Sequence, residues 1–124
     1  YDSCDPQSPM PVIHVHGLND ISIPVQGGDY VTPLQLVSNY WSSFNTCSEN
    51  IVVDGEDSNG DGYSWYSEIA TSCQNGVSIN FTYLENFGHS WPASYSNKGG
   101  GADIDGAVFI WEFLSLYDIS GLIN

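Results

Sequence analysis

The chain has 124 residues and carries 15 Asp and Glu residues against a single basic residue, Lys98, which gives a formal net charge of −14. This charge excludes binding to a nucleic-acid backbone, which needs several Lys or Arg side chains, and it argues equally against anionic membranes. The length suits one compact domain, and no apolar run reaches the roughly 18 residues of a membrane span. We therefore expect a folded, soluble chain with a neutral or cationic partner.

The first predicted element is a β-branched run at residues 12–16, which is typical of a strand buried on both faces of a parallel sheet. Gly17 ends this strand, and residues 18–24 follow as a loop at its C-terminal edge, where open α/β sheets place functional groups. Pro33 then opens an amphipathic helix that ends near Cys47, because its apolar residues recur at three- and four-residue steps.

The second half of the chain predicts a hairpin, a strand and a helix. Alternating apolar residues indicate the strands, and Asp103 or Asp105 is the predicted start of the helix. The predicted segments are a strand at 51–53, an acidic loop at 54–62, a returning strand at 63–69, a strand at 77–84, a long loop at 85–101 and a helix that ends near residue 117. This order predicts an α/β domain portion over residues 1–117, followed by an exit segment or linker at 118–124.

Three cysteines make an odd count, which in a secreted chain implies one internal bridge and one thiol whose partner lies elsewhere. Cys47 ends the predicted helix and Cys73 ends a predicted strand, whereas Cys4 lies in a Pro-rich lead-in. This placement favours a Cys47–Cys73 disulfide, and buried reduced cysteines are the alternative.

Asp20 and His89 each lie in a loop directly after a predicted strand. A Ser-His-Asp system needs that arrangement, because the carboxylate holds the imidazole and the imidazole reaches a nucleophile across the edge of the sheet. The spacing alone is a weak signal. Its context is stronger, with His-Gly-Leu-Asn-Asp at residues 16–20 and Phe-Gly-His-Ser-Trp-Pro at residues 87–92.

These motifs resemble the secreted polyhydroxybutyrate-depolymerase-like and feruloyl-esterase-like branch of the α/β-hydrolases, from about Cys4 to Tyr117. The resemblance implies that Asp20 is the triad acid and His89 the general base. It also implies the C-terminal half of an α/β-hydrolase sheet, with parallel strands, a hairpin and two flanking helices. No Gly-x-Ser-x-Gly occurs in the sequence, so the serine would come from an upstream half of the domain, to which Cys4 would also be bridged.

The resemblance predicts a secreted carboxylic ester hydrolase that acts on a polyester, a feruloyl or acetyl ester of plant polysaccharide, or a small ester. Trp91 would line the acyl or aromatic pocket, with a buried structural role as the alternative. Because the nucleophile is missing, we expect the isolated chain to be inactive. The alternative function is a non-catalytic structural, self-assembling or carbohydrate-binding module, which would show no hydrolysis even with the upstream half present.

The acidic loop matches the oxygen-ligand spacing of a calcium-binding loop. The candidate calcium ligands are Asp57, Asn59, Asp61 and Glu68. No helix precedes the loop, so a solvated turn is the favoured reading, and a structural calcium is the only cofactor considered.

His14 and His16 alternate along the first predicted strand. Two such histidines can bind a metal ion, but no third ligand follows at a suitable spacing. A structural role is therefore favoured for this pair.

Overall fold

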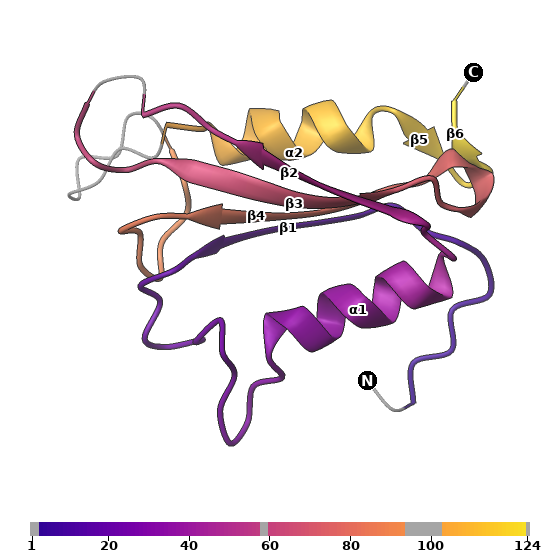
Figure 1. Ribbon diagram of the computed structural model, residues 1–124, viewed down its shortest axis with the longest axis horizontal. Coiled ribbons are helices and arrows are strands. Elements are labelled where there is room, and N and C mark those ends of the chain that lie inside the picture. Colours follow the sequence, from indigo (N-terminus) through magenta and orange to yellow (C-terminus); the bar gives the residue numbers. More distant parts are fainter. Residues whose placement is uncertain (1–2, 58–59, 94–102, 124) are drawn as a thin grey trace.

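The structure is a computed structural model that describes residues 3–57, 60–93 and 103–123. Its elements are β1 (Val12–Gly17), α1 (Leu34–Phe44), β2 (Glu49–Asp54), β3 (Trp65–Thr71), the short 3-10 helix η1 (Gln74–Gly76), β4 (Ile79–Leu84), α2 (Gly106–Leu114), β5 (Tyr117–Asp118) and β6 (Gly121–Leu122). Figure 1 shows three layers, in which α1 and α2 cover opposite faces of the central sheet.

The central sheet is mostly antiparallel, so the expected half of a parallel α/β-hydrolase sheet is wrong. The strand order is β1-β4-β3-β2, and only β1 and β4 run parallel, while β3 is antiparallel to both of its neighbours. The reason lies in the connections. Short links join β2 to β3 and β3 to β4, and links of that kind reverse the chain direction, whereas α1 and a hairpin separate the parallel pair.

The core lies on both faces of β4, which alone among the strands of the described residues is buried at every position. On the α1 face, Leu34 packs with Ile79 and Phe81. On the α2 face, Leu84 packs with Ile104 and the partly buried Phe109. β4 therefore forms the rigid centre from which the following loop emerges.

Helix α2 begins at the second of the two predicted positions, since the Asp105 carboxylate accepts hydrogen bonds from the backbone N–H groups of Ala107 and Val108. The N–H of Gly106 donates to the carbonyl of Pro92 at 2.9 Å. This bond ties the start of α2 to the loop that follows β4.

The segment expected to leave the domain forms the hairpin of β5 and β6. Its turn ends at Gly121, whose φ is 111° and whose Cα faces the backbone of Asn75 so closely that a Cβ would overlap the Asn75 carbonyl oxygen. Only glycine fits both conditions. The hairpin therefore packs on η1 rather than extending away from it.

The Cys47–Cys73 disulfide predicted from the sequence is confirmed, and Cys4 is an exposed free thiol. The bridge links the end of α1 to the end of β3 across 26 residues. Within the described ranges, no helix has the length and apolar character that crossing a membrane requires.

Removing the disulfide is expected to lower the free energy of unfolding by about 2–4 kcal/mol, because the unfolded chain regains the entropy of an open loop. Chemical denaturation of the Cys47→Ala/Cys73→Ala double variant measures this loss. Cys4→Ala is the matched control and should leave the unfolding midpoint unchanged. Equal stability of the double variant and the control would contradict the prediction.

Candidate active site at the ends of β1 and β4

The loops that carry Asp20 and His89 emerge at the same edge of the sheet, because β1 and β4 are its parallel pair. Backbone hydrogen bonds join the loops directly. The N–H of Leu18 donates to the carbonyl of Leu84, and the N–H of Asn19 donates to the carbonyl of Phe87, both at 2.9 Å. The two loops are thus held together before any side chain contributes.

Gly17 is the point of closest approach between the loops. A Cβ at this position would overlap the carbonyl oxygen of Phe87 and would lie 2.6 Å from the carbonyl oxygen of Gly88. Real Cβ atoms do not approach backbone atoms so closely, so only glycine permits this packing. Glycine here sets the spacing between the loops that carry Asp20 and His89.

The predicted contact between Asp20 and His89 is present. His89 Nδ1 lies 2.8 Å from Asp20 Oδ2, which is normal hydrogen-bond distance. The Asp20 side chain is 6% exposed and the His89 side chain 62% exposed. Nδ1 of His89 faces the carboxylate, and no hydrogen bond joins its Nε2 to another described residue.

The other oxygen of Asp20 is held by its own loop. Oδ1 accepts hydrogen bonds from the backbone N–H groups of Ser22 at 2.9 Å and Ile23 at 2.8 Å. Burial opposes ionisation of the carboxyl group, but the bonds from Ile23, His89 and Ser22 outweigh it and lower the pKa of Asp20. Asp20 is therefore an anion at neutral pH, with its oxygens fixed in direction.

The lowered pKa predicts how Asp20 contributes to stability in acid. Since the folded-state pKa lies below the unfolded one, the contribution is present above about pH 4 and is lost as the pH falls through the folded-state pKa. Asp20→Asn should flatten the dependence of the unfolding free energy on pH below about 4. Denaturant titrations between pH 2 and 7 measure this pH dependence of the unfolding free energy. Asp29 is exposed, and Asp29→Asn is the control that should keep the wild-type slope. A wild-type slope in Asp20→Asn would contradict the prediction.

A pocket of about 450 Å³ opens at the Asp20–His89 pair. Two exposed apolar side chains border it, Ile23 at 41% and Trp91 at 62% exposed. Because Trp91 is exposed, the alternative of a buried structural tryptophan does not hold. The role of Trp91 in substrate binding stays a prediction. Ser90 also lines the pocket, but no hydrogen bond connects its hydroxyl to His89 among the described residues.

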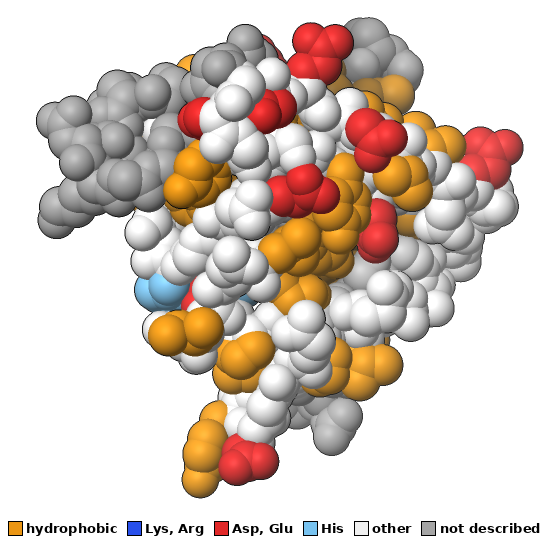
Figure 2. Space-filling view, turned by 60° about the vertical axis from the view of Figure 1, so that its left-hand side comes forward, with side chains coloured by type: hydrophobic (Ala, Val, Ile, Leu, Met, Phe, Trp, Pro, Cys, Tyr) orange, Lys and Arg blue, Asp and Glu red, His pale blue; other side chains and the backbone are white. Residues whose placement is uncertain are grey.

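The surface around the fold is acidic. Figure 2 shows Asp and Glu side chains spread over the face that it presents, interspersed with hydrophobic side chains and without Lys or Arg among the described residues. The only basic residue of the sequence, Lys98, lies outside the described residues. A field of this sign repels anionic ligands.

The candidate calcium ligands do not gather as the loop template requires. Asp57 and Asp61 lie together with Asp103, their nearest carboxylate oxygens within 4.8 Å of one another, whereas Glu68 lies in the middle of β3. Glu68 is therefore not a ligand of this loop, because the chain enters the sheet after the turn instead of continuing around an ion. Asn59 lies outside the described residues, and exposed carboxylates by themselves do not identify a metal site.

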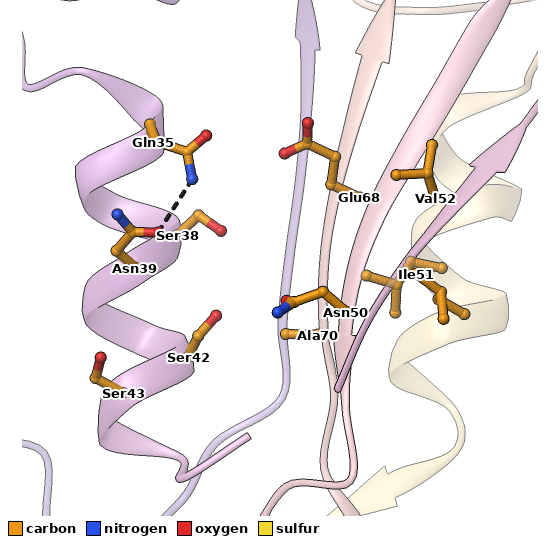
Figure 3. A pocket seen from close by; sticks show the side chains of 11 residues that line it. Gln35, Ser38, Asn39, Ser42, Ser43, Asn50, Ile51, Val52, Glu68 and Ala70 are labelled. Carbon is orange, nitrogen blue, oxygen red and sulfur yellow. Dashed lines mark hydrogen bonds between the residues drawn. The ribbon is translucent and has the colours of Figure 1, made fainter. Parts of the chain in front are cut away.

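A second hollow of about 560 Å³ lies between α1 and the β2–β3 edge of the sheet, away from the Asp20–His89 pair. Figure 3 shows Ser38 and Ser42 of α1 facing Glu68 and Asn50 across it, beside a hydrogen bond between Gln35 and Asn39. Its lining contains no histidine or cysteine. The groove offers hydrogen-bonding groups for a ligand but no acid–base pair.

Sequence reasoning missed two residues of the site, His16 and Gly17. His16 Nε2 lies 2.7 Å from the carbonyl oxygen of Ile23 and 3.5 Å from Asp20 Oδ2. The i,i+4 spacing between His16 and Asp20 at the end of a strand was the available signal, because a tight turn after the strand brings such residues together.

A scan against protein-family models and a search of curated proteins each found no match to this sequence.

Proposed function

We propose that Asp20 and His89 are the acid and the general base of a serine carboxylic ester hydrolase. The observation that carries this proposal is the 2.8 Å contact between His89 Nδ1 and Asp20 Oδ2, in a His89 side chain that lines the pocket and whose Nε2 bonds to no other described residue. A triad needs this orientation of the imidazole ring, because Nε2 must take the proton of the nucleophile while Nδ1–H is held by the carboxylate. The proposal rests on this pair and not on a parallel sheet.

In the proposed reaction a serine hydroxyl attacks the ester carbonyl and gives its proton to His89 Nε2. Asp20 stabilises the resulting imidazolium and keeps the ring oriented. The imidazolium then donates the proton to the leaving alcohol, and a water molecule, deprotonated in turn by Nε2, releases the acid from the acyl-enzyme. The serine and the backbone donors for the oxyanion come from a segment outside these residues, since the sequence holds no Gly-x-Ser-x-Gly.

The pocket and the charge support an uncharged ester as substrate. Trp91 and Ile23 offer apolar surface next to His89, which suits an aromatic or aliphatic acyl group. The resemblance of residues 88–92 to depolymerase-like and feruloyl-esterase-like enzymes supports a polyester or an acylated plant polysaccharide. An extracellular setting fits the disulfide, because such bonds persist in oxidising compartments.

Turnover of p-nitrophenyl acetate and methyl ferulate tests the proposal. The chain alone is expected to give no rate above buffer, and the chain joined to the serine-bearing segment should hydrolyse at least one of them. Hydrolysis by the chain alone would show a nucleophile among these 124 residues and would contradict the assignment of the serine. Absence of hydrolysis in the joined protein would favour a non-catalytic module that self-associates or binds carbohydrate, which sedimentation and glycan titration would then identify.

A further inference from the structure

Two histidines of β1 form a hydrogen-bonded chain that ends at the backbone carbonyl of Ile23, close to Asp20. His14 Nε2 lies 3.0 Å from His16 Nδ1, and His16 Nε2 lies 2.7 Å from the carbonyl oxygen of Ile23. The same His16 nitrogen lies 3.5 Å from Asp20 Oδ2, the oxygen that contacts His89. Asp20 thus stands between two imidazoles, one exposed and one only 9% exposed.

The partners determine where the protons of the pair lie. A carbonyl oxygen only accepts hydrogen bonds, so His16 carries its proton on Nε2 and donates it to Ile23. In a neutral ring Nδ1 is then the acceptor, and His14 must donate to it from its own Nε2. The carbonyl oxygen of Ile23 thus determines the tautomers of both His16 and His14.

The surroundings of His14 favour its neutral form. Burial, and then the neighbouring His16, lower the pKa of His14, whose ring stacks on Phe81. Tyr83 of β4, in register with His16, also stays neutral, because burial and the nearby Glu68 and Tyr66 raise its pKa to about 12. The negative charge next to the pair is that of Asp20.

We propose that His16 is a positioning residue for the Asp20–His89 pair, held in one ring orientation by its contacts with His14 and the Ile23 carbonyl. By donating to the Ile23 carbonyl, His16 fixes the loop whose N–H groups hold Asp20 Oδ1. This inference rests on the proposed function, which gives the Asp20–His89 pair its role.

Three variants separate positioning from packing. His16→Gln keeps an N–H donor near the position of Nε2, whereas His16→Leu keeps bulk without a donor. His14→Phe keeps an aromatic ring to stack on Phe81 but removes the donor to His16. Long-range ¹H–¹⁵N spectra of the 124-residue chain report the tautomer and charge of each ring, and circular dichroism confirms that each variant is folded.

In the wild type His16 is expected to carry a proton on Nε2, facing the Ile23 carbonyl, and His89 to carry one on Nδ1, facing Asp20. His16→Leu should give His89 a mixture of tautomers and His16→Gln should restore the single form, while His14→Phe should let His16 exchange tautomers. In the serine-containing protein His16→Leu should lower kcat by about 10²-fold, the scale of an ångström-sized misplacement, with KM little changed, and His16→Gln should recover most of the rate.

A His16 that carries its proton on Nδ1, or a His89 tautomer that is the same in His16→Leu and wild type, would overturn the proposal. The spectra do not depend on hydrolysis. Tautomers that follow the expected pattern in a protein without turnover would therefore support the positioning role and count against the proposed function alone.

Discussion

Asp20→Asn is expected to lower kcat for ester hydrolysis by about 10⁴ in the serine-containing protein, on the precedent of serine proteases. An amide at this position can donate to His89 Nδ1, which forces the ring proton onto Nε2. That nitrogen could then no longer accept the proton of the serine. Steady-state hydrolysis of p-nitrophenyl acetate measures the loss, and KM should change far less than kcat.

Asp29→Asn is the matched control for this prediction. Asp29 is an exposed loop residue, and its substitution removes the same charge without touching the pair. The control should keep the wild-type rate. A rate for Asp20→Asn within tenfold of the control would show that the carboxylate does not act on His89 during the reaction.

Gly17→Ala is expected to separate the two loops of the site. Its methyl group would overlap the Phe87 carbonyl and crowd that of Gly88, so β1 and the loop of His89 must move apart. Overpacking of this kind costs about 1–3 kcal/mol of folding stability. A displacement near 1 Å at His89 should also lower kcat by about 10²-fold.

Gly28→Ala tests whether the effect of Gly17→Ala comes from the close contact of Gly17 with the loop of His89. Gly28 has a negative φ and nothing within 4 Å of an added Cβ, so the same substitution there should leave stability and rate unchanged. Denaturation midpoints and kcat of both variants decide the matter. Equal behaviour of Gly17→Ala and Gly28→Ala would contradict the close packing of the two loops.

The site was predictable because its two residues follow the two strands that run parallel. Residues after parallel strands emerge at one edge of a sheet, so Asp20 and His89 meet whatever the remaining strands do. The disulfide was predictable for a similar reason, since Cys47 and Cys73 end elements that are close in sequence.

The hairpin of β2 and β3 was predicted, but the antiparallel pairing of β3 with β4 was not predictable, because local periodicity does not encode the partner of a strand. The run at the start of β1 predicted burial on both faces, yet β1 lies at an edge of the sheet and is mostly half-buried. Alternation like that of β4 is typical of a strand with one solvated face, but the polar positions of β4 are also buried. Thr82 there bonds to Ser67 and Asn80, which satisfies these groups inside the fold.

The calcium template failed at its last position for a physical reason. Spacing along a sequence places Glu68 next to the loop only if the chain keeps curving around an ion. Here the chain straightens at Trp65 into β3, and strand geometry carries Glu68 to the groove beside α1. A loop motif must therefore be judged together with the element that follows it, here the strand predicted at residues 63–69 and found as β3.

Labelling by a fluorophosphonate, which reacts only with an activated serine, tests the central claim most directly. The serine-containing protein should be labelled on one serine outside the 124 residues, and His89→Ala should abolish labelling while the fold, followed by circular dichroism, is retained. Labelling that persists at the wild-type rate in His89→Ala would contradict the claim that His89 and Asp20 activate the nucleophile.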